Sequence, residues 1–171
     1  MIRQNLHTHS IYVDGKDTIE EMIETAIEKG FTKLGFSEHA YLEEDDVCMT
    51  QETTEQYIEE VRFFQQKYCD QIEIFLGLEQ DMFYRDPHPE MYDYIIGSGH
   101  YLRKDLQVNS VDNTTDHTDF MFANWFEDDF LRYADAYYSQ LREMKDWKEV
   151  DIIAHLDLLM KFNDDQHYIN R

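Results

Sequence analysis

Two histidines stand two residues apart near the start of the sequence, His7 and His9 in the stretch RQNLHTHSIYVDGKDT. In an extended strand, residues i and i+2 point to the same face. Two imidazoles on one face repel each other when both are protonated, whereas neutral imidazole is a common ligand for zinc, iron and similar ions. The pair alone fits a solvated strand end as well as a metal site, so the choice between these two interpretations depends on the other residues of the sequence.

Further metal-capable residues follow apolar segments that are typical of strands. They are His39 in GFSEHA, Glu79 and Asp81 in FLGLEQD, His100 in IIGSGHYL and His155 in DIIAHLDL. One histidine at such a position is more often structural. Five histidines and a carboxylate at five strand ends instead favour a metal cluster, because parallel α/β barrels build their active sites at the carboxyl ends of the strands. A carboxylate after an apolar run is costly to bury unless it is paired or coordinated, so we predict that Glu79 bridges two cations.

Other histidines and acidic runs are interpreted as surface features. His88 in RDPHPE and His117 in TTDHTD lie in stretches that resemble turns. Asp165 and His167 form an Asp-x-His pattern, but they stand in a polar tail after the last predicted strand. The acidic run 43–46 is typical of a solvated loop. None of these residues enters the predicted cluster.

The elements that must position the cluster alternate along the chain. Strands are predicted over 1–6, 31–36, 71–78, 92–98 and 150–155, and helices over 17–30, 53–68 and 125–145. Strands separated by helices indicate parallel β-α-β units. Thr18 and Glu21 have capping-box spacing, and Gly30 is a helix stop signal. The crossover between the third and fourth strands has a weak helical signal, and a polar connection is predicted over 109–119.

Composition excludes several classes of protein. The 171 residues include 37 acidic and 15 basic side chains, for a formal net charge of −22. That charge argues against nucleic acid and against an anionic membrane as partners, since both need a basic surface. Cys48 and Cys69 read as ordinary thiols of a reducing compartment. Neither a signal peptide nor an apolar run of roughly 20 residues is present, so we expect a cytoplasmic protein.

The ordered set HTHS…DGKDT, GFSEHA, GLEQD, GSGHYL and DIIAHLDLLMKF resembles the PHP family, named for polymerase and histidinol phosphatase domains. Within that family it is most similar to the monofunctional bacterial histidinol-phosphatases. The resemblance implies one α/β domain over 1–171, a distorted (β/α)7 barrel, and two or three divalent metals such as zinc, iron or manganese. It implies these site residues: His7, His9 and Glu79 on a first metal, Glu79 bridging to a second, His39 and His155 on a further metal, His100 joining the cluster, and Asp14 beside it.

One departure from the family pattern affects the expected fold. The family ends with an Asp-x-His motif on a later strand, whereas this sequence ends at Arg171, soon after the fifth predicted strand. We therefore expect a C-terminally truncated domain with about five parallel strands. Its open sheet edges would leave backbone groups unpaired and invite self-association.

The expected chemistry is metal-assisted hydrolysis of a small phosphorylated substrate. The resemblance implies L-histidinol phosphate, an intermediate of histidine biosynthesis, with Asp14, Glu79 and His100 as catalytic residues. Arg103, Lys104 and Lys161 are candidate phosphate ligands. Two alternatives stay open. The chain could be another PHP phosphoesterase that acts on phosphotyrosine or nucleotides, or an inactive remnant of a PHP domain that only binds metal.

Overall fold

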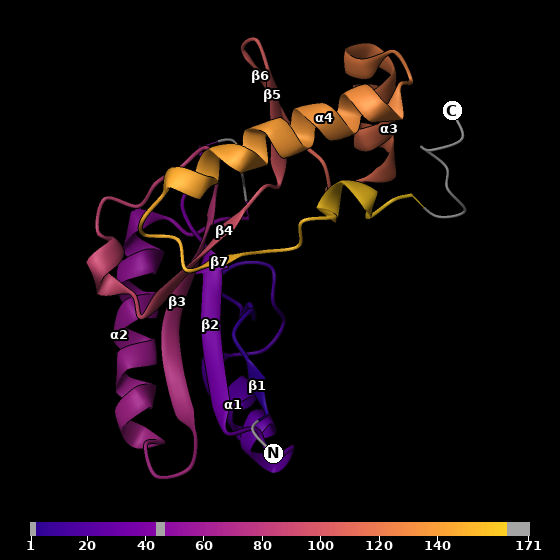
Figure 1. Cartoon of the computed structure of the whole chain (residues 1–171). Coiled ribbons are helices and arrows are strands. Elements are labelled where there is room, and N and C mark those ends of the chain that lie inside the picture. Colours follow the sequence, from indigo (N-terminus) through magenta and orange to yellow (C-terminus); the bar gives the residue numbers. More distant parts are fainter. Residues whose placement is uncertain (1–2, 44–46, 164–171) are drawn as a thin grey trace. The chain divides into compact units, whose positions relative to one another are not determined.

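The computed structural model describes residues 3–43 and 47–163. Backbone contacts divide the chain into two compact units, Met1–Ile96 and Gly97–Arg171. Figure 1 colours them along the sequence, from indigo at the N-terminus to yellow at the C-terminus. The predicted ligands are divided between the units: His7, His9, His39 and Glu79 belong to the first, and His100 and His155 to the second.

The first unit consists of parallel strands and two helices. Its elements are β1 (Gln4–Asn5), α1 (Ile19–Glu28), β2 (Lys33–His39), α2 (Gln51–Lys67), β3 (Glu73–Asp81), a 3-10 turn (Pro89–Met91) and β4 (Tyr94–Ser98), which continues into the second unit. β1 pairs in parallel with β2, and β2 with β3, in a register that runs from Lys33 opposite Glu73 to His39 opposite Glu79. β4 follows β3 in the sheet order. The predicted elements of this unit are confirmed, including the irregular crossover before β4.

Local signals in the sequence explain where α1 begins and ends. The Thr18 hydroxyl accepts a hydrogen bond from the Glu21 N–H, while the Glu21 carboxylate accepts one from the Thr18 N–H. This reciprocal capping box satisfies two backbone donors at the helix start. Beyond the helix end, Gly30 has a φ of +73°, which glycine adopts without the steric penalty of a side chain.

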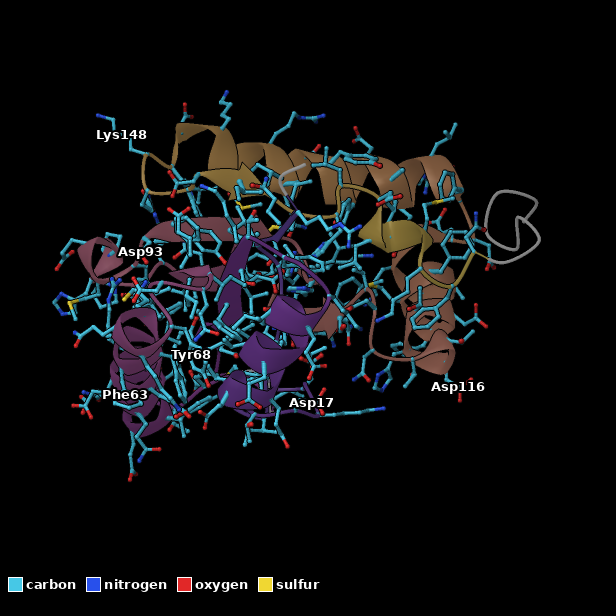
Figure 2. All side chains as sticks on the ribbon, turned by 90° about the horizontal axis from the view of Figure 1, so that it is seen from below. Asp17, Phe63, Tyr68, Asp93, Asp116 and Lys148 are labelled. Carbon is cyan, nitrogen blue, oxygen red and sulfur yellow. The ribbon has the colours of Figure 1, made fainter. Side chains whose placement is uncertain are left out.

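The helix α2 packs one side against β3 and exposes the other. Tyr57, Val61 and Phe64 are buried on the packed side, whereas Phe63 is 60% exposed (Figure 2). The Tyr57 hydroxyl donates a 2.7 Å hydrogen bond to the carbonyl of Gly77 in β3. A buried phenol needs such a partner, so this bond fixes the helix on the strand that carries Glu79.

The second unit contains a hairpin, two helices and a short strand. Its elements are β5 (Tyr101–Lys104), β6 (Gln107–Ser110), α3 (Thr115–Phe126), α4 (Phe130–Leu141), β7 (Ile152–Ile153) and 3-10 turns over Arg142–Asp146 and Leu158–Met160. β5 and β6 are antiparallel and contact α4 and α3, respectively (Figure 1). β7 stands after β4 in the sheet order, and the Ala154 N–H donates to the Gly97 carbonyl. The described residues thus include the five expected strands, and the α/β class is confirmed.

The polar connection predicted over 109–119 is wrong. Its first residues lie in β6 and its last residues in α3, which begins after Thr114. The hairpin turns at Asp105, whose φ of +56° lies in the left-handed region. Strand alternation in YLRKDLQVNS is weak, because charged and amide side chains occupy half of the positions of this largely exposed ribbon.

The single helix predicted over 125–145 is also wrong. α3 ends at Phe126 and α4 begins at Phe130, because Glu127 and Asp128 adopt φ values of +57° and +58°. The Asp129 carboxylate then accepts hydrogen bonds from two N–H groups of the new first turn. Aspartate is a strong N-cap, so the chain starts a second helix there. Among the described helices, none has the length and apolar character needed to cross a membrane.

Candidate metal centre

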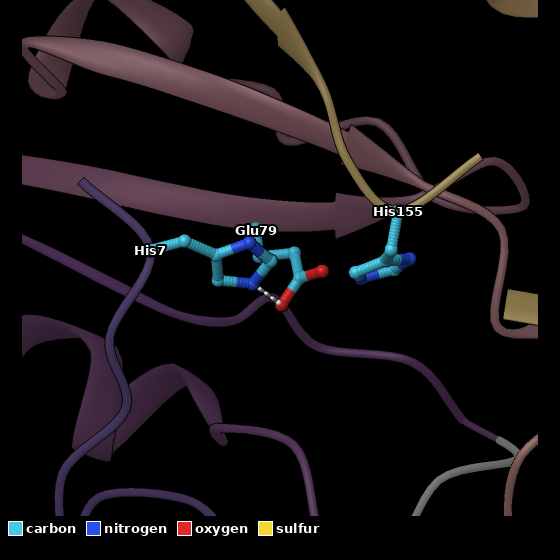
Figure 3. Close-up of side chains that lie close together, drawn as sticks. All are labelled: His7, Glu79 and His155. Atoms are coloured by element: carbon cyan, nitrogen blue, oxygen red, sulfur yellow. Dashed lines mark hydrogen bonds and ion pairs between the residues drawn. The ribbon is translucent and has the colours of Figure 1, made fainter. Parts of the chain in front are cut away.

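Three imidazoles converge on one carboxylate oxygen in the first unit. The Oε2 atom of Glu79 lies 3.0 Å from His7 Nε2, 3.2 Å from His9 Nε2 and 3.3 Å from His39 Nδ1. Figure 3 shows the first of these contacts. The Glu79 side chain is fully buried, and the three histidines are 18–33% exposed. Nitrogen and oxygen donors of these four residues therefore lie together and are partly accessible to solvent, and their role as metal ligands stays a prediction.

The parallel register of β2 and β3 places two of these ligands side by side. His39 is paired directly with Glu79, and the Ala40 N–H donates to the Glu79 carbonyl at 2.8 Å. His39 is the last residue of β2 and Glu79 lies two residues before the end of β3, so their side chains meet near the carboxyl edge of the sheet. Glu79 and Asp81 lie inside β3, which extends past the predicted strand end.

The segment with the two N-terminal histidines lies along β2. The Ser37 N–H donates a 3.0 Å hydrogen bond to the Thr8 carbonyl, and the Thr8 hydroxyl donates to the Gly35 carbonyl at 2.8 Å. These bonds hold the backbone between His7 and His9 against the strand that ends in His39. The rings of His9 and His39 stack with centroids 4.4 Å apart.

Asp14 approaches the same histidines from a tight loop. Its Oδ1 atom lies 3.9 Å from His9 Nδ1 and 3.9 Å from His39 Nε2, and its side chain is 55% exposed. Gly15 permits this loop, since a Cβ at that position would lie 2.3 Å from the His9 carbonyl oxygen. His9, Asp14 and His39 offer one ligand atom each within 4.8 Å of one another, so they form a candidate metal-binding group within the first unit.

The electrostatics of this unit favour cations. Burial lowers the pKa of His9, but the hydrogen bond that its ring donates to Glu79 and the charges of Glu79, Asp14 and Glu38 outweigh this effect and raise the pKa above 6.5. The negative potential that favours a protonated imidazole also attracts a divalent ion. The ion and a proton compete for the same ring nitrogen, because only the unprotonated nitrogen binds metal.

Sequence reasoning missed Glu38. Its side chain is fully buried, its carboxylate accepts hydrogen bonds from the Ser10 N–H, and Oε2 lies 4.0 Å from His9 Nδ1. Burial raises the pKa of Glu38, and the Ser10 hydrogen bonds oppose that rise. A signal was present, because an acidic residue within a buried strand requires a partner.

The second unit brings two further predicted ligands together. The ring centroids of His100 and His155 are 5.0 Å apart. The Ser98 hydroxyl lies 3.2 Å from His100 Nδ1, and His155 stands two residues beyond β7. The two histidines are separated by more than fifty residues of sequence, so their approach is a tertiary feature of this unit.

The candidate phosphate ligands differ in their contacts. Lys104 donates to the Trp125 carbonyl at 2.9 Å, and Lys161 donates to the Asp112 carbonyl at 2.8 Å. Both ammonium groups therefore have partners within the second unit. Arg103 is exposed in β5, and its role in binding phosphate stays a prediction.

The residues interpreted as surface features are exposed wherever the structure describes them. His88 contacts Glu90 at 3.3 Å and is solvated. His117 is exposed as predicted, but it lies in α3 rather than in a loop. Residues 44–46, Asp165 and His167 lie outside the described residues. Cys48 and Cys69 are free cysteines, consistent with the predicted thiols.

The donor set fits a divalent transition metal. Imidazole nitrogens with a carboxylate oxygen suit zinc, iron or manganese. One further observation supports the fit, because His9 Nδ1 is buried and makes no hydrogen bond to the described residues. A buried polar atom in that state is unusual, and a cation is one partner that satisfies it.

Curated relatives share sequence with much of the chain. The probable histidinol-phosphatase of Schizosaccharomyces pombe is 25% identical over 154 residues, and the histidinol-phosphatase of Bacillus subtilis is 30% identical over 125 residues. The aligned parts cover 71% and 63% of this chain, but 48% and 47% of those proteins. The chain thus spans about half the length of the curated relatives it matches.

Solved structures share the fold. A candidate histidinol phosphatase from Listeria monocytogenes matches with a TM-score of 0.80 at 20% identity, over 95% of this chain and 70% of that one. The histidinol phosphate phosphatase of Lactococcus lactis, solved with zinc, L-histidinol and phosphate, matches with a TM-score of 0.62 at 20% identity, over 92% and 59%. These likenesses confirm the predicted partial PHP barrel. The PHP domain model matches residues 5–171, nearly the whole sequence, and the chain therefore belongs to the PHP domain family.

Proposed function

We propose that this chain hydrolyses phosphate monoesters with two or three divalent metal ions, and that L-histidinol phosphate is its substrate. The observation that carries the proposal is the convergence of three imidazoles on one oxygen of Glu79. Three imidazoles that crowd one buried carboxylate oxygen have the spacing of ligands around an ion, because metal–ligand bonds of about 2.0 to 2.2 Å place neighbouring donor atoms roughly 3 Å apart. Zinc, iron and manganese are the candidate ions.

The names of the relatives support the choice of substrate. Both curated relatives are histidinol-phosphatases, and the Lactococcus lactis structure contains L-histidinol and phosphate, the two products of that hydrolysis. The acidic composition, with a net charge of −22, supports a small substrate over a long nucleic acid. A single domain over 1–171, a cytoplasmic location and self-association through sheet edges stay predictions.

The residues of the chain have distinct proposed tasks. His7, His9, His39 and Glu79 would hold metal in the first unit, and His100 and His155 would contribute ligands from the second. Bound divalent ions would lower the pKa of a water molecule and neutralise charge on the phosphoryl oxygens. Asp14, half-exposed beside His9 and His39, would be the first proposed donor of a proton to the leaving alkoxide. His100, where it is not fully engaged by metal, is the second proposed proton carrier, and the Ser98 hydroxyl lies 3.2 Å from its Nδ1 atom.

A substrate panel tests the function. Protein purified without chelator is analysed for transition metals and assayed with histidinol phosphate, a phosphotyrosine peptide and a mononucleotide. We expect bound metal, with turnover highest for histidinol phosphate. Higher turnover of another monoester would show that the reaction is right but that the substrate is not histidinol phosphate. Bound metal without turnover would favour a metal-binding role without catalysis. Absence of metal after reconstitution would contradict both the hydrolase and the metal-binding role.

A further inference from the structure

Glu38 lies next to the candidate ligands but belongs to no ligand set predicted from the sequence. Its side chain has an exposed fraction of 0%. A carboxylate in such a place is unfavourable unless hydrogen bonds replace its lost hydration. Here the Ser10 N–H donates to both oxygens, at 2.9 and 3.1 Å. The negative charge of Glu38 is therefore stabilised by hydrogen bonds from one residue, Ser10.

That residue is the centre of the ligand loop, which we define as residues 9–15. Ser10 directly follows His9, and its carbonyl accepts hydrogen bonds from the N–H groups of Val13 and Gly15 at 3.2 and 3.0 Å. The peptide groups of Ser10 thus connect Glu38 on one side with the turn that carries Asp14 on the other. A shift of Ser10 would move both His9 and Asp14.

Glu38 also faces the ring of His9. Its Oε2 atom lies 4.0 Å from His9 Nδ1, while His9 Nε2 lies 3.2 Å from Glu79. At 4.0 Å the contact between Glu38 and His9 is electrostatic and not a hydrogen bond, and a negative charge beside a ligating imidazole raises the basicity of the imidazole as a ligand. Glu38 is thus placed to act on His9 through both the backbone and the ring.

We infer that Glu38 is a positioning residue that holds the ligand loop and thereby sets the metal affinity of the first unit. It acts through Ser10 and His9, and both of its oxygens are engaged by the Ser10 N–H. The inference rests on the proposed metal centre. Nothing in it requires Glu38 to touch metal or substrate.

The test compares Glu38→Gln with Glu73→Gln in the full chain. Glu73 is a matched control, since it begins β3 at the opposite end of the sheet and pairs with Lys33 at the surface. Zinc affinity is measured by competition with a chelating dye, and the geometry of the centre by the visible spectrum of the cobalt-substituted protein. We expect Glu38→Gln to weaken zinc binding by on the order of tenfold to a hundredfold and to shift the cobalt bands. Glu38→Asp should recover part of the affinity, and Glu73→Gln should match the wild type.

Two results separate failure of the inference from failure of the proposed function. Equal zinc affinity and cobalt spectra for Glu38→Gln and wild type would overturn the inference alone. No zinc binding by the wild type would overturn the proposed function and, with it, the inference. If Glu38→Gln does not fold, the test is hydrogen exchange of the Ser10 amide in the wild type. Slow exchange would support the inference that Glu38 holds the ligand loop through this amide. Exchange as fast as in an unprotected loop would contradict it.

Discussion

The two units hold their histidines in different ways. In the first, regular parallel pairing of β2 with β3 aligns His39 with Glu79, and backbone hydrogen bonds to β2 add His7 and His9. In the second, His100 follows a strand end and His155 follows a strand of two residues, so loop backbone sets their approach. A metal site needs ligands held closely in place, and regular elements do this better than loops. We infer that the first unit is the stronger metal-binding part.

The largest expected effect comes from Glu79→Gln. An amide keeps the size of the side chain but removes the charge on which three imidazoles converge. We expect metal affinity and turnover to fall by at least roughly a hundredfold, with the helical and strand content preserved. Metal titration and circular dichroism check this, with Glu73→Gln in the same strand as the control. Full metal content in Glu79→Gln would remove Glu79 from the centre.

Histidine variants in each unit sharpen the comparison. His39→Gln should weaken metal binding by about tenfold more than His155→Gln, because His39 belongs to the set held by strand pairing. Both variants should lose turnover if both units supply ligands. The control is His88→Gln, because the His88 ring is 71% exposed and lies 3.3 Å from the exposed Glu90 carboxylate. A larger loss of metal affinity in His155→Gln than in His39→Gln would show that the second unit contributes more to metal binding than the first.

A glycine substitution tests the ligand loop. In Gly15→Ala the new Cβ would lie 2.3 Å from the His9 carbonyl oxygen, so the loop must shift. We expect metal affinity to fall roughly tenfold, together with a loss of about 1 to 3 kcal/mol in the free energy of unfolding. Gly30→Ala is the matched control, because its φ of +73° strains alanine far from the ligands. It should lower stability by about 1 kcal/mol and leave metal affinity unchanged. Equal affinities in the two variants would show that the loop is not needed.

The smallest expected effect concerns the pH dependence of stability in the first unit. Burial raises the pKa of Asp93, but hydrogen bonds from Leu76, Arg62 and Gln65 outweigh this effect and hold the pKa below 3.8. A depressed carboxyl pKa adds stability above the unfolded pKa and loses it as the pH falls through the folded value. Asp93→Asn should therefore cost roughly 1 to 2 kcal/mol at neutral pH, and this difference should shrink below about pH 4. Thermal melts between pH 3 and 7 measure it, with exposed Asp70→Asn as control. A difference that does not vary with pH would assign the effect to packing instead.

Much of the first unit could be predicted because its signals are local. Thr18 with Glu21 marks the start of α1, Gly30 marks its end, and apolar runs mark β2 and β3. The four candidate ligands of the unit could be proposed from the rule that parallel strands share one functional edge. Glu38 could not be assigned a role, because its partner is a backbone N–H twenty-eight residues away.

The second unit was harder to predict for a physical reason. Its helix break depends on left-handed φ values at Glu127 and Asp128, which acidic residues adopt only when the surroundings favour them. Its hairpin carries little strand alternation, and β7 has only two residues. Elements that tertiary contacts stabilise leave a weak pattern in the sequence.

X-ray absorption at the zinc edge of the zinc-loaded protein reports which atoms bind the metal. We expect a first shell of nitrogen and oxygen at about 2.0 to 2.1 Å, with the outer-shell scattering of several imidazoles. That pattern should weaken in His39→Gln and collapse in Glu79→Gln. A shell containing sulfur at about 2.3 Å would point to the free thiols instead, and it would contradict the claim that the histidines around Glu79 form the metal centre.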